Sequence, residues 1–96
     1  MILLDTSVWI DHLRQGEPRL VELLAEGEVL VHPFVVAEVA LGSRARRDSV
    51  IAILEALPQA PVALHEEVMA LIEDERLYGL GIGHVDVHLL ASARLA

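Results

Sequence analysis

The chain has 96 residues, 54% of them hydrophobic and none of them cysteine, so we expect one small domain without disulfides or thiolate metal sites. Its formal net charge of −8 excludes a general binder of the nucleic-acid backbone, because phosphate attraction needs a positive surface. No apolar run reaches the roughly 18 residues that span a bilayer, and the N-terminus does not resemble a signal peptide. The surplus of apolar residues therefore indicates a protein partner or self-association.

Short apolar segments alternate with amphipathic ones along the chain, with glycine and proline at most boundaries. The predicted elements are, in order, a strand over 2–4, a helix from Thr6 to about Leu13, a helix from Pro18 to Gly27, a strand over 29–31, a helix from Pro33 to Gly42, a helix from Asp48 to Leu57, a strand over 61–64, a long helix from Leu64 to Gly79, and a helix from His84 to Leu95. This alternation favours an α/β fold, a short parallel sheet flanked by helices in three layers.

The first predicted strand ends on a carboxylate, Asp5, which is followed by the hydroxyl residues Thr6 and Ser7. Asp5 has two explanations from sequence, which are equally good in isolation. It caps the helix that begins at Thr6, or it belongs to a functional site, since sites on parallel sheets lie beyond the carboxyl ends of the strands. Asp5 alone does not decide between them.

Two further acids stand in apolar surroundings. Glu38 is the one polar residue of "PFVVAEVALG", and Asp86 lies near the start of the last predicted helix among apolar neighbours. Each has an ordinary explanation, an exposed rim position for Glu38 and a favourable helix-dipole contact for Asp86. A buried carboxylate must be paired or bind a cation, and oxygen-only ligands suit Mg²⁺ or Mn²⁺. The conjunction of Asp5, Glu38 and Asp86 therefore predicts a metal site.

Other polar residues give weaker signals. His84 and His88 have the i, i+4 spacing of helical zinc sites, but no third ligand motif accompanies them, and we expect His88 to pack or to form hydrogen bonds. Trp9 is expected in the core. The basic cluster of the chain is interpreted as a possible phosphate contact or a partner of local acids, and it consists of Arg44, Arg46 and Arg47.

Three segments, "MILLDTSVWIDHL", "PFVVAEVALGS" and "GIGHVDVHLLASA", resemble the VapC-like toxins, which are ribonucleases of the PIN-domain family. The resemblance covers essentially the whole chain in the family's order and spacing. It implies that Asp5, Glu38 and Asp86 bind Mg²⁺ or Mn²⁺ and are the catalytic residues. Ser7, and with it Thr6, would support the site by hydrogen bonding.

The activity that the resemblance implies is metal-dependent endoribonuclease cleavage, in which an activated water attacks an RNA phosphodiester and leaves a 5′-phosphate and a 3′-hydroxyl. The chain would be the cytoplasmic toxin of a type II toxin–antitoxin system, inhibited by a small antitoxin protein and forming a homodimer, with no membrane attachment.

One departure from the family pattern concerns the C-terminus. Family members continue through a final strand and a fourth acid, whereas this sequence ends at Ala96, so we expect residues 1–96 to be a single PIN-like domain that lacks its last strand. The alternative function is a catalytically inactive, truncated domain that serves as an antitoxin-binding or dimerisation module.

Overall fold

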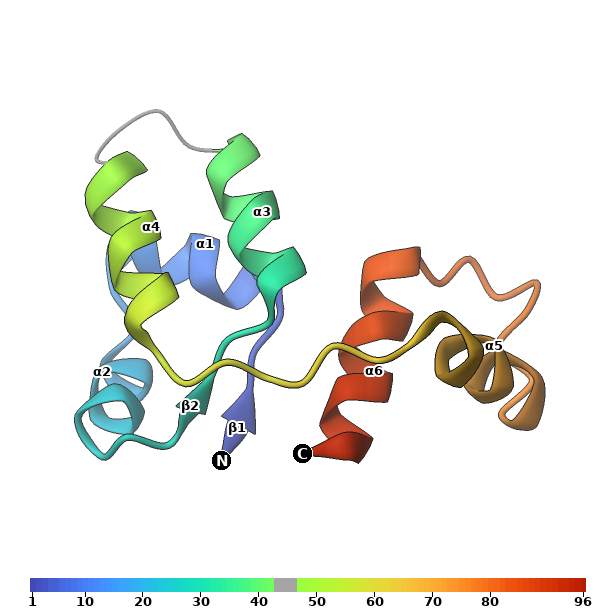
Figure 1. Ribbon diagram of the computed structural model, residues 1–96. Coiled ribbons are helices and arrows are strands. Elements are labelled where there is room, and N and C mark those ends of the chain that lie inside the picture. Colours follow the sequence, from blue (N-terminus) through green and yellow to red (C-terminus); the bar gives the residue numbers. More distant parts are fainter. Residues whose placement is uncertain (43–46) are drawn as a thin grey trace.

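A computed structural model describes residues 1–42 and 47–96 (Figure 1). The elements of these ranges are β1 (Ile2–Leu3), α1 (Thr6–Gln15), α2 (Pro18–Ala25), β2 (Val29–Leu30), α3 (Pro33–Gly42), α4 (Arg47–Ala56), α5 (His65–Asp74) and α6 (His84–Leu95). Short parallel strands with flanking helices confirm the predicted α/β fold. None of the described helices is long and apolar enough to cross a membrane.

The sheet is short and parallel. Within the described residues it consists of β1 and β2, with Ile2 opposite Val29 and Leu3 opposite Leu30. At the start of β1, the Ile2 N–H donates a hydrogen bond of 2.7 Å to the carbonyl oxygen of Glu28, the residue before β2. Both strands end just before a helix, so the N-termini of α1 and α3 follow the carboxyl edge of the sheet.

The predicted third strand over 61–64 is wrong. Instead, Val31 forms an isolated parallel bridge with Gln59, in which the Val31 N–H donates to Pro58 O and the Ala60 N–H donates to Val31 O. The segment then leaves the sheet, and the Val62 side chain remains 47% exposed. Of the four residues of the segment only Ala63 is buried, in the smaller core, so the apolar composition reflects the packing of one side chain and not a paired strand.

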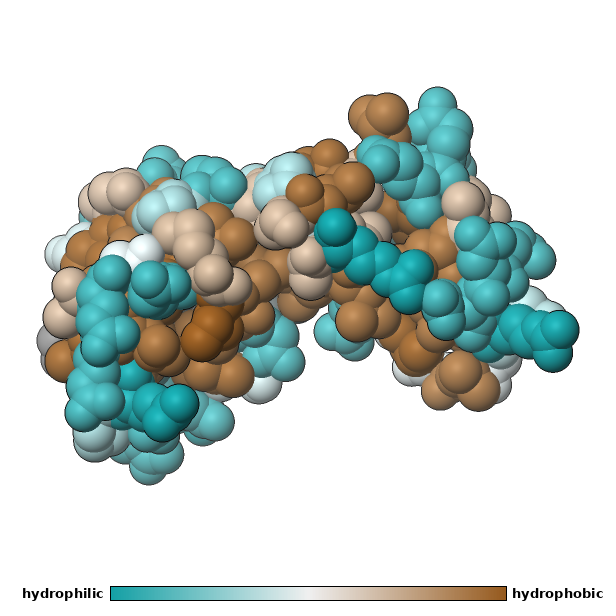
Figure 2. Space-filling view, turned by 90° about the horizontal axis from the view of Figure 1, so that it is seen from below, coloured by the Kyte–Doolittle hydropathy of each residue, from teal (hydrophilic) through white to brown (hydrophobic). Residues whose placement is uncertain are grey.

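The helices divide into two lobes (Figure 1). The larger lobe contains the sheet and α1 to α4, and the smaller one is the pair α5 and α6, which has a buried cluster of its own. Viewed from below, a hollowed waist separates the lobes, with hydrophilic residues gathered toward both ends of the molecule (Figure 2). The α6 helix lies on the waist side of the smaller lobe, where its Leu89 packs against the core of the larger lobe.

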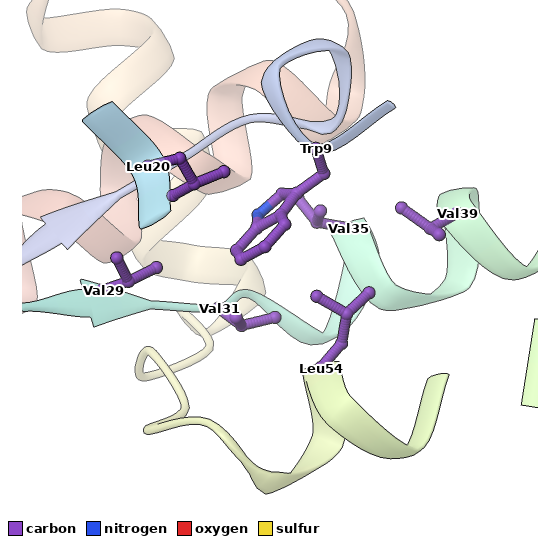
Figure 3. Packing of buried hydrophobic residues seen from close by; sticks show 7 residues of the cluster. All are labelled: Trp9, Leu20, Val29, Val31, Val35, Val39 and Leu54. Carbon is purple, nitrogen blue, oxygen red and sulfur yellow. The ribbon is translucent and has the colours of Figure 1, made fainter. Parts of the chain in front are cut away.

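The core of the larger lobe surrounds Trp9 (Figure 3). The indole is 2% exposed and comes from α1, so it ties the start of that helix to the rest of the lobe. This confirms the expected core position of Trp9. The other buried members of the cluster come from α2, from the second strand and the residue after it, and from α3 and α4, and they are Leu20, Val29, Val31, Val35, Val39 and Leu54.

The long helix predicted from Leu64 to Gly79 is shorter in the structure, because α5 ends at Asp74. The Leu77 N–H donates to Ile72 O and the Arg76 N–H donates to Glu73 O. These are the two hydrogen bonds of a Schellman motif, and Arg76 takes the left-handed position with φ of 52°. Leu77 then packs beside Ile72 in the smaller core, which closes the helix end.

Candidate functional site

Asp5 lies where β1 passes into α1, as the sequence predicted. Its Oδ1 accepts hydrogen bonds from Ser7 Oγ at 2.7 Å and from the Val8 N–H at 3.2 Å, so it caps α1. The capping explanation is therefore correct, but it involves only one carboxylate oxygen. No described residue donates to Oδ2, and the side chain is exposed, so the second oxygen is available to a ligand.

Glu38 lies on α3 and is exposed, while Val35 and Val39 fill the buried side of the same helix. Its Oε1 accepts a hydrogen bond of 2.8 Å from Thr6 Oγ1. This bond joins residues 32 positions apart and fixes the carboxylate of Glu38 beside the first turn of α1. Thr6 directly follows Asp5 in the chain, so the structure brings Glu38 to the same end of α1 as Asp5.

Asp86 lies in the first turn of α6 and is exposed. Its Oδ2 is 3.6 Å from the point that a Cβ on Gly83 would occupy, so the carboxylate reaches back toward the start of its helix. A carboxylate at this position is stabilised by the positive end of the helix dipole.

A cleft of about 590 Å³ lies between the lobes and brings Asp5 and Asp86 to one cavity. The other residues that line the cleft are apolar and come from β1 and the residue after it, from α1, and from α6 and the segment before it. They are Leu3, Leu4, Val8, Ile82, Leu89, Leu90 and Ala93. Glu38 does not line this cleft, and its connection to it runs through Thr6 and the start of α1. Asp5 and Glu38 thus lie at the N-terminus of α1, and Asp86 shares the cleft with Asp5.

The donor set fits a hard divalent cation, because every candidate ligand is a carboxylate oxygen. Among the described residues, no three acid or histidine side chains come close enough to hold one ion directly. Mg²⁺ is commonly held by one or two carboxylates together with water and substrate phosphate. Asp5 and Asp86 are the two carboxylates that line the same cleft, so they are the candidate pair for such a site.

The predicted phosphate contacts lie mostly outside the described part of the chain. Arg44 and Arg46 are not described, and Arg47 is known only as the first residue of α4. Of the described cations, Arg94 donates to Glu75 at 2.7 Å within the smaller lobe. The phosphate role of the arginine cluster therefore remains a prediction.

Four rings meet between α3 and α6, and we call them the ring group: His32, Phe34, His84 and His88. The ring centroids of Phe34 and His88 are 4.6 Å apart, and those of His84 and His88 are also 4.6 Å apart. His88 is buried, as expected for a packing residue. The sequence signal that could have revealed this group is the i, i+4 spacing of His84 and His88. In the structure this pair packs on Phe34 and does not form a three-ligand metal site with other described residues.

The buried ring of His32 favours its neutral form. Its Nδ1 accepts a hydrogen bond of 3.0 Å from the Phe34 N–H, which places the ring proton on Nε2, where no described residue accepts it. Burial, together with repulsion from His88, lowers the pKa of His32 below its ordinary value of 6.5. Protonation would also place a hydrogen on Nδ1 and break the bond from Phe34.

We expect the free energy of unfolding to fall as the pH drops below 6.5, because the unfolded chain binds a proton at His32 more readily than the folded one. Above that pH His32 is neutral in both the folded and the unfolded chain, and its contribution to the free energy of unfolding is fully present. Urea unfolding at a series of pH values should show a slope that is smaller in His32→Leu, by at most about 1.4 kcal/mol per pH unit. An equal slope in both proteins would contradict this role of His32.

Comparison with known proteins identifies the family of the chain. The sequence profile described as "PIN domain" matches residues 2–96. The chain is 53% identical over 95 residues to "Ribonuclease VapC32" of Mycobacterium tuberculosis (strain CDC 1551 / Oshkosh), with 99% of this chain and 77% of the relative covered, and the same values hold for that of strain ATCC 25618 / H37Rv. No solved structure matches the chain significantly. The chain therefore belongs to the PIN-domain family, as a VapC-like member.

Proposed function

We propose that the protein is a Mg²⁺- or Mn²⁺-dependent endoribonuclease and the toxin of a type II toxin–antitoxin pair. Membership of the PIN-domain family and high identity to two proteins named as ribonucleases support the reaction class. The observation that carries the proposal is the placement of Asp5 and Asp86 in one cleft, with Glu38 linked to the same helix end by Thr6.

In this proposal Asp5 and Asp86 hold the cation in the cleft, and Glu38 acts on it through water, because no three of the described side chains are close enough to bind one ion directly. The bound ion would activate water and neutralise charge that develops on the phosphate. Ser7 orients the carboxylate of Asp5 through the bond to Oδ1, and Oδ2 is left to bind the ligand. Thr6 does the same for Glu38. The cation also offsets the repulsion between an acidic protein and RNA.

Removal of the metal tests the reaction directly. We expect the protein to cut a mixed RNA pool in Mg²⁺ or Mn²⁺, to leave 5′-phosphate ends, and to stop when EDTA is added. Glu38→Gln should lower the cleavage rate about 10- to 100-fold, because it removes a negative charge near the cation while keeping an oxygen that accepts from Thr6. Gel analysis of labelled RNA measures both effects.

The matched control is Glu22→Gln, which makes the same change at an exposed glutamate of α2. Glu22 does not line the cleft. Among the described residues, it forms no hydrogen bond with Asp5 or Glu38. Cleavage that persists in EDTA, or an equal loss in Glu22→Gln, would show the proposed site to be wrong.

We also propose a small antitoxin and a second copy of the chain as protein partners, acting in the cytoplasm. Large apolar side chains that are more than half exposed support such contacts, since exposed apolar surface marks interaction sites. Leu41 on α3 is 88% exposed, and Leu64 and Leu80 around α5 are 64% and 65% exposed. Their distribution over both lobes suits more than one partner surface.

A further inference from the structure

The ring group presents a partly open aromatic surface next to the acids. His84 is exposed and Phe34 is partly exposed, while His88 between them is buried. The centroids of Phe34 and His84 are 6.3 Å apart and the two ring planes are tilted by only 32°. His88 contacts both rings at 4.6 Å and meets each at a steep angle, so it supports them from beneath.

Each half of this surface belongs to a helix that carries a candidate ligand. Phe34 stands one turn before Glu38 on α3, so the two side chains share a face of that helix. His84 is the first residue of α6 and precedes Asp86 by two positions. Asp86 Oδ2 reaches back toward Gly83, the residue before His84. The rings are therefore carried by the same two helices as Glu38 and Asp86, close to them along the chain.

The chemistry of this surface suits a nucleobase better than a phosphate. The described residues around the acids offer little positive charge, and the chain as a whole carries a net charge of −8. Affinity for a single-stranded nucleic acid can instead come from stacking of bases on aromatic side chains, which is tolerant of sequence. Unpaired RNA bases are commonly held in this way.

Resting on the proposed function, we propose that Phe34 and His84 form a stacking platform for an unpaired base of the RNA next to the bond that is cut. His88 acts as a positioning residue that holds both rings. The platform would restrict cleavage to single-stranded or looped RNA, because a base inside a duplex has no free face to offer.

The test measures RNA binding by the full chain in an Asp5→Asn background, which removes the proposed cleavage. The probe is an unstructured oligoribonucleotide of mixed sequence with 2-aminopurine at successive positions, whose fluorescence falls when it stacks. We expect Phe34→Leu and His84→Leu each to weaken binding about 5- to 100-fold and to remove the fluorescence change. His84→Phe should retain both, because it keeps a planar ring.

The matched control is Tyr78→Leu, which removes an aromatic side chain that is 61% exposed and has no ring contact among the described residues. Equal RNA binding by all variants, or an equal loss of binding in Tyr78→Leu, would overturn the platform. The proposed function would still stand in that case if the wild type shows metal-dependent cleavage. Failure of His84→Phe to restore binding would also overturn the platform. A changed molecular mass with unchanged RNA binding would assign the rings to a protein contact, and absence of both RNA binding and cleavage would overturn both proposals.

Discussion

Asp5→Asn is expected to lower metal-dependent RNA cleavage at least about a hundredfold while changing the free energy of unfolding by less than about 0.5 kcal/mol. Asparagine caps helices as well as aspartate, so its side-chain oxygen can still accept from Ser7 and from the Val8 N–H. It cannot supply a second anionic oxygen to a cation. Cleavage assays and urea unfolding on the same preparations measure the two quantities.

Asp5→Ala is the companion variant, because it removes the cap as well as the charge. We expect it to lose cleavage to the same extent and, in addition, about 1 kcal/mol of stability. Mg²⁺ should raise the melting temperature of the wild type and of neither variant, since an ion that binds only the folded state stabilises it. If Asp5→Asn still cleaves RNA and only Asp5→Ala is impaired, Asp5 is a helix cap and not a ligand.

Two helix ends explain how far the sequence predicted the fold. Both α2 and α5 end in a Schellman motif, with the N–H of Glu28 donating to Leu23 O in the first and that of Leu77 donating to Ile72 O in the second. The first end was predicted because Gly27 occupies the left-handed position, with φ of 68°. The second was missed because an arginine, Arg76, occupies the left-handed position, and the packing of Leu77 in the smaller core that accompanies it is not visible in the local sequence.

The candidate site shows a similar division. Strand ends and helix starts can be read locally, so Asp5 and Asp86 were placed at the correct ends of their elements. The bond from Thr6 to Glu38 and the ring contacts of Phe34 join segments that are distant in sequence, and no local pattern predicts such pairs. The prediction that Glu38 is buried among apolar residues was wrong, because Glu38 is exposed while Val35 and Val39 of the same helix are buried in the core.

Trp9→Ala is expected to cost about 3 to 5 kcal/mol of folding free energy, the usual range for truncating a buried tryptophan. The indole is 2% exposed and fills the centre of the larger lobe, among residues from α2 to α4 (Figure 3). The total free energy of unfolding of a native protein is often only about 5 to 15 kcal/mol, so the variant should unfold at a much lower urea concentration than the wild type. Because Trp9 is the one tryptophan of the chain, unfolding should be followed by circular dichroism.

Trp9→Phe separates the volume of the ring from its polar atom. The buried Nε1–H has no partner among the described residues, so its removal relieves an unsatisfied donor and offsets part of the lost packing. We expect a loss below about 1.5 kcal/mol, with cleavage retained because α1 still presents Asp5 and Thr6 at the same place. A Trp9→Phe variant as unstable as Trp9→Ala would contradict the offset expected from removing the unpaired Nε1–H, and a stable Trp9→Ala would show that this core does not hold α1.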